Sequence, residues 1–258
     1  MEFNAPPLFR HLAIALLAAT FVQCSQDEPD NKALINCDIS LFSNAAMQGK
    51  VTINQALINL NQIQVTGTQP SLSTSTFTKA LSADDGIFDL MDPNSPSIRV
   101  DAERNDYDPL SLTLTLGSDS NSPQIENTAP NIESYLQSAK PAFLISARFD
   151  NRGRAIPIYV AFPAVSPLKS MAEQYGSVRV KIDVENVAEI QLNPGHLFDG
   201  LTTQQLEGAT KAIYQNQEVI FIHPNFNGAL YDILLSRLED APNSMKVKVK
   251  VTRSLEDK

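Results

Sequence analysis

Several residue types on which recognition and catalysis often depend are scarce in this sequence. It has no tryptophan, two cysteines and three histidines among 258 residues. The absence of tryptophan weakens a carbohydrate-binding interpretation, because sugar-binding surfaces favour exposed aromatic rings. Tyr107, Tyr159 and Tyr175 are the available substitutes, although the strand pattern around Tyr159 favours packing. No H-E-x-x-H, C-x-x-C or G-x-S-x-G motif surrounds the histidines.

Basic residues are outnumbered as well. The chain has 20 Lys and Arg against 29 Asp and Glu, a net charge of −9. This balance argues against nucleic acid as a partner, because that binding depends on contacts of Lys and Arg with phosphates. It also argues against adsorption to anionic lipid headgroups. We interpret the acidic charge as a source of solubility.

Long apolar runs are missing, and the run near the N-terminus is short. Residues 12–22 are apolar or small apart from Thr20, and they follow Arg10 and His11. The run is too short to cross a bilayer, which takes about 20 apolar residues. Its place between a basic pair and a polar, acidic segment is typical of a secretory signal. We therefore predict a signal peptide over residues 1–23.

The end of this segment resembles a bacterial lipobox. In the sequence Phe21-Val22-Gln23-Cys24 the cysteine would be diacylated and become the first residue, although Phe21 and Gln23 depart from the usual Leu and small residue. Residues 25–28 (SQDE) resemble the acidic tag that sends some Gram-negative lipoproteins to the cell surface. The resemblance implies an outer-membrane lipoprotein anchored at Cys24, surface-exposed or periplasmic. Cleavage at an earlier site, which gives a soluble secreted protein, is the alternative.

The domain plan follows from this anchor. We expect the lipidated cysteine and a flexible tether over residues 24–45, and a single β-sandwich-like domain over residues 46–258. Acylation of Cys24 leaves Cys37 without a partner for an intrachain disulfide, so the domain relies on its packed core. We interpret Cys37 as a small, partly buried hydrophobe, because Lys32 is the one nearby basic residue that would activate a thiol.

Alternating apolar residues predict most of the strands. The alternation is strict at 110–116 and 178–184, and it changes phase between 50 and 67, which predicts a bulge or bend. Two alternating runs flank a turn at Gly153 and predict a β-hairpin, with Pro157 at an edge or non-bonded position. Five hairpin residues should lie in the core: Phe143, Ile145, Phe149, Ile158 and Val160.

Three segments favour helices. Residues 131–139 are helix-permissive, and so are residues 201–217 with an interruption at Gly208. Asn227 is a candidate N-cap. After Asn227, apolar residues recur at helical spacing: Leu230, Ile233, Leu234 and Leu238. About eight strands without βαβ alternation predict a mainly β protein, an antiparallel β-sandwich with two or three helical decorations.

This layout resembles uncharacterised surface lipoproteins of Gram-negative bacteria that carry domains of unknown function. The resemblance covers about residues 50–240. It rests on VTINQALINLNQI (51–63), the Phe/Ile hairpin, LFDGL (197–201) and HPNFNGALYDILLSRLEDA (223–241). It implies location and fold, and it assigns no catalytic residue and no cofactor.

The densest acidic cluster offers a candidate metal site. Oxygen-bearing side chains recur in the segment that holds Asp101, Glu103, Asn105 and Asp108, a spacing that resembles the start of a Ca²⁺ loop. Asp106 stands where such a loop needs Gly, Leu112 stands where it needs Glu, and Arg104 opposes a cation. A solvated turn is the alternative interpretation.

The histidines that follow the predicted signal are weaker candidates. His196 and His223 lie in turn segments, and Asp199 or Asp232 is close enough in sequence to complete a metal or acid/base site. We interpret both histidines as locally hydrogen-bonded turn residues.

Near the C-terminus, lysines alternate with valines. The lysines are Lys246, Lys248 and Lys250, and the valines are Val247, Val249 and Val251. Lysines on one strand face disfavour edge-to-edge pairing, and docking of an acidic partner such as a charged glycan is the alternative.

Together these patterns predict a non-catalytic binding or assembly module of the cell envelope, with an envelope protein or glycan as its partner. The alternative is a hydrolase of envelope or extracellular glycans. It would use two loop carboxylates roughly 5–9.5 Å apart. Its candidate acids are Asp84, Asp85, Asp106 and Glu133.

Overall fold

The computed structural model describes most of the chain between residues 32 and 251. The chain divides into two units, Met1–Lys32 and Ala33–Lys258, and the described residues other than Lys32 belong to the second. They are residues 32–41, 47–48, 50–82, 85–92, 94, 97–117, 125, 131–171, 178–182, 184–199, 201–240 and 245–251. The predicted signal peptide, the lipobox, Asp84 and Tyr175 lie outside them.

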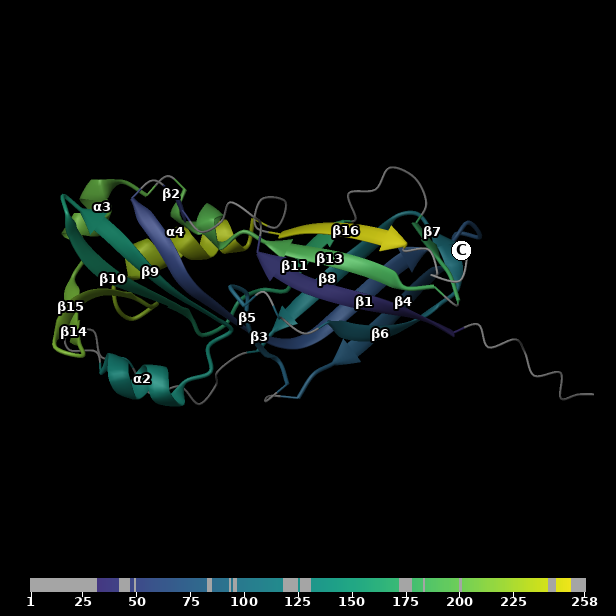
Figure 1. Ribbon diagram of the computed structural model, residues 1–258, viewed down its shortest axis with the longest axis horizontal. Coiled ribbons are helices and arrows are strands. Elements are labelled where there is room, and N and C mark those ends of the chain that lie inside the picture. The colour runs from purple at the N-terminus through teal and green to yellow at the C-terminus, as the bar shows by residue number, and fades with distance from the viewer. Residues whose placement is uncertain are drawn as a thin grey trace, which may run out of the picture. The chain divides into compact units, whose positions relative to one another are not determined.

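Two sheets face each other and confirm the mainly β fold class (Figure 1). One has the order β16 (Met245–Val251), β13 (Asn186–Leu192), β1 (Lys32–Leu41) and β6 (Ile98–Glu103). The facing layer is formed by β11 (Leu168–Met171), β8 (Leu110–Leu116), β3 (Val51–Thr68) and β4 (Thr74–Ala80). At the two sides of the sandwich, β6 approaches β4 and β16 approaches β11.

The prediction of a flexible tether over residues 24–45 is wrong for residues 32–41. Residues Lys32–Leu41 form β1, which pairs in parallel with β13 and buries Ile35, Cys37 and Ile39. The alternation of these residues with polar neighbours is the period-two signal of a half-buried strand. The sandwich is also not purely antiparallel, since β10 (Arg154–Phe162) pairs in parallel with β15 (Gln217–Ile222).

The phase change at 50–67 is a pair of bulges in one long strand. In β3, Val51–Ile58 pairs with β9 (Phe143–Asn151), and Leu60–Gly67 pairs with β8. The register shifts at Asn54 and again at Asn61. The extra residue at each bulge returns the apolar side chains that follow it to the buried face of β3, so the bulge prediction is confirmed.

The Phe/Ile hairpin is formed as predicted by β9 and β10. Phe149 lies opposite Ile156, and Arg152 and Gly153 both have positive φ in the two-residue turn. All five predicted core residues are buried. Pro157 directly precedes the three residues of β10 that pair with β15, so its missing N–H falls outside that ladder.

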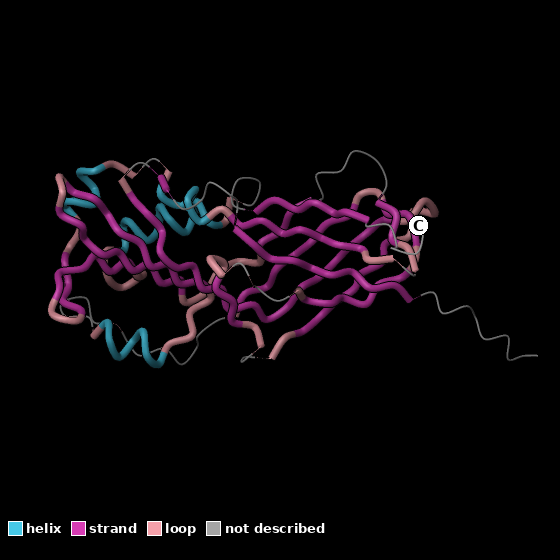
Figure 2. Tube along the Cα trace, in the orientation of Figure 1, coloured by secondary structure: helices cyan, strands magenta, loops and turns pink. Residues whose placement is uncertain are grey.

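Helices lie beside the part of the fold that contains β9, β10, β14 and β15 (Figure 2). They are α2 (Ile132–Ser138), the 3₁₀ helix η1 (Pro194–Phe198), α3 (Thr203–Gly208) and α4 (Gly228–Leu238). Asn131 caps α2 through its side chain, which accepts a hydrogen bond from the Ser134 N–H. Asn227 precedes α4 as predicted, but its amide instead bridges Thr210 and the Phe221 carbonyl.

Two further segments agree with the sequence only in part. The segment 201–217 is interrupted at Gly208 as predicted, because α3 ends there, but β14 (Lys211–Tyr214) follows as a hairpin with β15. The Lys211 ammonium donates to three carbonyls at the end of α3, which closes the helix there. The strand expected over 178–184 ends at Val180 as β12 (Val178–Val180), which pairs with β7 (Asn105–Tyr107).

The lysine-bearing strand β16 lies at the edge of its sheet. Register places Lys246 opposite Gln191 and Lys248 opposite Glu189 on β13. Among the described strands, β16 pairs with β13 alone, so the edge position that motivated the protective interpretation is confirmed. The roles of the lysines stay a prediction.

Candidate functional site: a groove at the open edge of the sandwich

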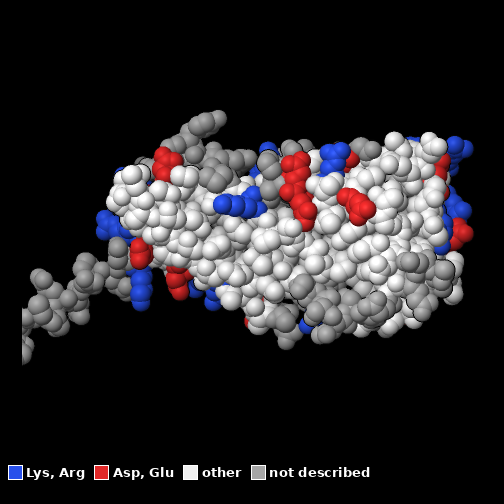
Figure 3. Space-filling model, turned by 180° about the vertical axis from the view of Figure 1, so that it is seen from behind, with Lys and Arg blue, Asp and Glu red and all other residues white. Residues whose placement is uncertain are grey.

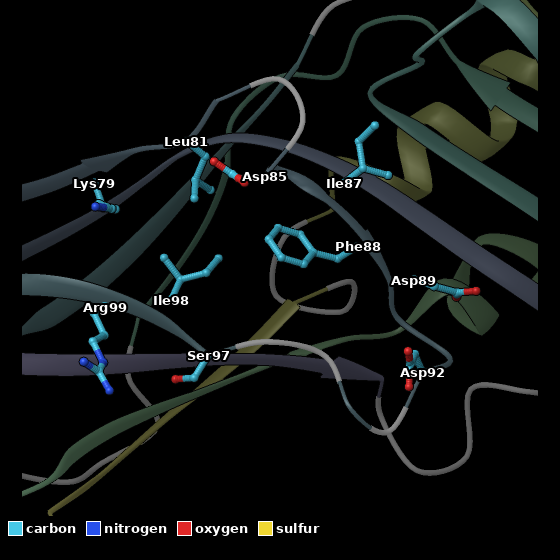
Figure 4. Close-up of a pocket in the computed structure, with 10 residues that line it drawn as sticks. All are labelled: Lys79, Leu81, Asp85, Ile87, Phe88, Asp89, Asp92, Ser97, Ile98 and Arg99. Atoms are coloured by element: carbon cyan, nitrogen blue, oxygen red, sulfur yellow. The ribbon is translucent and has the colours of Figure 1, made fainter.

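A groove lies where the end of β4 and the start of β6 diverge. We call it the edge groove; β5 (Ile87–Asp89) forms its third wall (Figure 4). Its volume is about 550 Å³, within the ~300–1,000 Å³ range of small-ligand sites. The lining residues are Lys79, Leu81, Asp85, Ile87, Phe88, Asp89, Asp92, Ser97, Ile98 and Arg99.

The groove exists because both sheets end there. Within the described chain, β4 pairs only with β3, and β6 is the last strand of its sheet next to β1. β5 continues along the same edge of β3 as β4, opposite Leu57–Asn59. Although β6 approaches β4, the outer backbone edges of both strands have no hydrogen-bonded partner strand among these residues, which is the arrangement that accepts an added strand.

The floor of the groove is apolar. The ring of Phe88 points toward Leu81 and Ile98 in Figure 4, while Ile87 points away from them. Phe88 and Ile98 are buried, and Ile87 is 40% exposed, which is high for a large aliphatic side chain. An apolar side chain of a ligand would find contacts here without displacing a charged group.

The charges of the groove are separated along its length. Lys79 and Arg99 lie at one end, Asp89 and Asp92 lie at the other, and Asp85 lies between them beside Leu81 (Figure 4). On the face of the protein that Figure 3 shows, acidic and basic side chains of the described residues are interspersed on a largely uncharged surface. The edge groove therefore has a polarity of its own that favours a ligand with charges in the reverse order.

Local hydrogen bonds hold the groove carboxylates. Asp89 accepts from the Met91 N–H at 3.0 Å and from the Gln55 amide at 3.2 Å. Asp85 accepts from the Ser82 hydroxyl at 2.6 Å, and Asp92 accepts from the Asn94 N–H at 2.8 Å. These bonds fix the turns around β5 and set the direction in which the negative charge faces.

The residues predicted to bind Ca²⁺ do not gather around one point. Asp101 and Glu103 lie on the exposed side of β6, and Asp108 is exposed before Pro109. The Asn105 side chain accepts from the Asp106 N–H. No group of three or more His, Cys, Asp or Glu side chains that could hold a metal ion occurs in the part of the chain that the structure describes.

Asp106 has a different partner, which the sequence did not indicate. Its carboxylate accepts two hydrogen bonds from Arg179, at 2.6 and 3.0 Å, and this pairing lowers the pKa of Asp106. The pair lies in a second cavity of about 620 Å³, here called the end pocket. Its lining residues are Arg104, Asn105, Asp106, Arg179, Val180, Lys181 and Ile182. Only the pairing of β7 with β12, 73 residues apart in sequence, brings them together.

His196 joins two acidic side chains. Its Nδ1 lies 2.9 Å from Asp199 Oδ2, and its Nε2 lies 3.7 Å from Asp240 Oδ2. The two carboxylates face different nitrogens of the ring, so the three groups do not converge on one metal position. They connect η1 with the end of α4, which is a structural role.

His223 lies in a separate apolar cluster with Tyr135 and Phe221. Its ring centroid is 5.2 Å from that of Tyr135 and 5.8 Å from that of Phe221, and its Nδ1 accepts from the Asn225 N–H. Burial lowers the pKa of His223 to about 4. A neutral ring among aromatics fits the interpretation of a local turn residue. Among the described residues, Asp232 forms neither a hydrogen bond nor an ion pair with it.

The candidate acids of a hydrolase are dispersed. Asp85 lines the edge groove, Asp106 lines the end pocket, and Glu133 lies in the first turn of α2. Tyr107 is buried beneath β3, and Tyr159 packs edge-on against Tyr214. Burial raises the pKa of the Cys37 thiol to about 12, so this cysteine stays protonated and behaves as a hydrophobe.

None of the helices among the described residues is long and apolar enough to cross a membrane. Comparisons of the chain with protein-family models, with curated proteins and with solved structures gave no match. The resemblance to Gram-negative surface lipoproteins therefore stays a prediction.

Proposed function

We propose that this protein is a lipoprotein of the cell envelope that binds an extended segment of a partner protein in the edge groove. The location is supported by the sequence, through the short apolar run, Cys24 and the acidic residues that follow it. The binding role is supported by one observation above all, the apolar groove between the outer edges of β4 and β6. The proposal assigns no chemical step to the protein.

The shape of the groove favours an extended polypeptide. A strand that adds to a sheet edge gains backbone hydrogen bonds, and pockets for alternate side chains supply its specificity. Three consecutive lining residues, Ser97, Ile98 and Arg99, run along the start of β6 and give such a segment a straight path. The favoured ligand has an apolar residue over Phe88, an acidic residue toward Arg99 and a basic residue toward Asp92.

A glycan fits this site less well than a peptide. Sugars stack on exposed aromatic rings, and the one aromatic ring of the groove, Phe88, is only 6% exposed. A glycan hydrolase is nevertheless the second candidate, because Asp85, Asp89 and Asp92 line one groove. Turnover of a glycan that is abolished by Asp85→Asn would replace the binding proposal with the hydrolase.

The proposal is tested with a displayed library of short peptides selected on the purified protein. Selected peptides should share an apolar residue with an acidic and a basic residue on opposite sides. The double variant Lys79→Glu/Arg99→Glu should weaken their binding at least tenfold, and the binding should depend on salt. Lys169→Glu, which changes an exposed lysine on β11 outside the groove, is the matched control and should bind as the wild type does. Selected peptides that bind the groove variant and the control equally would contradict the proposal.

A further inference from the structure

The turn between β3 and β4 carries a leucine in an unusual position. Leu72 is 86% exposed, the largest exposure among the large apolar side chains of the described residues. Its φ is 65°, in the left-handed region that bulky residues rarely adopt. Its described neighbours Ser71 and Ser73 are polar, so the leucine stands alone at the tip of the hairpin.

A network of hydrogen bonds holds this tip in its conformation. The Gln69 N–H donates to the Ser73 carbonyl at 2.8 Å, and the Leu72 N–H donates to the Gln69 carbonyl at 2.9 Å. The Gln69 amide also donates to Ser75 at 2.9 Å and accepts from the Ser73 hydroxyl at 3.1 Å. An exposed apolar side chain in a turn this well bonded is pre-organised for contact with something outside the protein.

The tip lies at the end of the sandwich where β1 begins. The Asp108 N–H donates to the Thr68 carbonyl at the base of the hairpin, so β7 lies beside it. β7 pairs with β12, and the next residue, Lys181, is joined through the Asn186 side chain to the Leu34 carbonyl on β1. The hairpin, the end pocket and the first residues of β1 therefore share one end of the fold.

The proposed anchor would hold this same end close to a bilayer. Seven residues, 25–31, separate Cys24 from Lys32 at the start of β1. Even fully extended, the eight steps from Cys24 to Lys32 span at most about 28 Å. Tethering at that distance raises the effective concentration of the tip at the membrane surface, so that even a weak contact is populated.

We propose that the Leu72 tip inserts into the lipid bilayer to which Cys24 is anchored. This inference rests on the proposed lipid anchor. A lone apolar side chain on a convex polar turn matches the boundary between headgroups and acyl chains, where the serines remain hydrated and the leucine is buried. Beside it, the end pocket is lined by Arg104, Lys181 and the Arg179–Asp106 ion pair, so Arg104 and Lys181 would be the cations nearest to the phosphates that phospholipids carry.

The absence of tryptophan allows a direct test. In the lipidated protein that begins at Cys24, Leu72→Trp places a single indole at the tip. The matched control is Ile213→Trp, which places the single indole elsewhere on the surface. Ile213 is 65% exposed on β14, in a hairpin remote from the start of β1 in Figure 1. Both variants are reconstituted into phosphatidylcholine vesicles, with and without brominated acyl chains. The Leu72→Trp emission should shift to the blue and lose at least half its intensity with brominated lipid, while the Ile213→Trp emission should change little.

Flotation of the vesicles separates the inference from the anchor on which it rests. Protein that floats with the vesicles but leaves the Leu72→Trp emission unquenched would overturn the insertion of the tip and leave the anchor intact. Protein that does not float would overturn both. Quenching that is equal at positions 72 and 213 would also overturn the inference, because it would mean that the domain lies on the bilayer without a preferred end.

Discussion

The ring of Tyr107 lies so close to the backbone of Gly67 that a Cβ atom at Gly67 would be 2.4 Å from the ring carbon Cδ1. Tyr107 is fully buried, its hydroxyl donates to the Glu103 carbonyl at 2.9 Å, and Phe77 packs against its edge. Glycine is required at position 67 because the tyrosine fills the place of its side chain. This contact fixes β7 beneath the base of the β3–β4 hairpin.

Gly67→Ala should therefore destabilise the domain by about 1–3 kcal/mol, the usual effect of overpacking a core. Gly208→Ala is the matched control, since nothing lies within 4 Å of a Cβ atom at that position. It should be neutral or stabilise the domain by up to about 1 kcal/mol, because Ala favours helix more than Gly does. Urea unfolding of the three proteins measures both changes, and equal midpoints for Gly67→Ala and wild type would show that Tyr107 can move aside.

The hairpin core should carry much of the stability. Phe149 is fully buried between β3 and β10, and Phe149→Ala should reduce the free energy of unfolding by about 3–5 kcal/mol. Phe77→Ala, at a half-buried position on β4, should have a smaller effect. The comparison uses the same denaturant titration, and a loss below about 1 kcal/mol for Phe149→Ala would contradict the register of β9.

Acid should weaken the fold through His223. Its pKa falls from 6.5 to about 4 on burial, so between these values the unfolded chain binds more protons than the folded one. The contribution of His223 to stability is therefore fully present above pH 6.5 and is lost as the pH falls toward 4, by on the order of 1–3 kcal/mol. His223→Asn keeps an acceptor for the Asn225 N–H and cannot gain a charge. Thermal unfolding measured from pH 7 to pH 4 should show a smaller decrease of the unfolding temperature in the variant than in the wild type. Equal decreases would exclude His223 as the cause.

Lipidation is predicted at Cys24 and not at Cys37. Metabolic labelling with an alkyne fatty acid should tag the wild type and Cys37→Ala, whose altered residue is fully buried in β1. Cys24→Ala should lose both the label and the association with membranes, because acyl chains hold this acidic domain to the bilayer. Undiminished membrane retention of Cys24→Ala would argue against the anchor.

Periodicity was a good guide wherever one strand or helix determines its own pattern. The β9–β10 hairpin, the alternation in β8 and the bulges at Asn54 and Asn61 were all visible in the spacing of apolar residues. The cap predicted at Asn227 is not made by its side chain, although α4 begins at the next residue. In the strands the signal is a repeat of two within the segment itself.

Pairing between distant segments left no such signal. β1 pairs with β13 at a separation of about 150 residues, and Asp106 meets Arg179 only because β7 pairs with β12. The edge groove was missed for the same reason, since its walls belong to two different sheets. Asp85 was noted as an acid in a loop, but its neighbours Lys79 and Arg99 come from strands whose positions the spacing does not define.

We propose above that an extended partner segment lies along the start of β6. The most direct test places a photoreactive residue at each of two positions, two residues apart, in a peptide selected on the protein. After irradiation, mass spectrometry locates the cross-links. We expect attachment near Ser97 for one position and near Arg99 for the other, because residues two apart on paired strands face the same side. Cross-links that fall outside the edge groove, or at one protein residue for both positions, would contradict it.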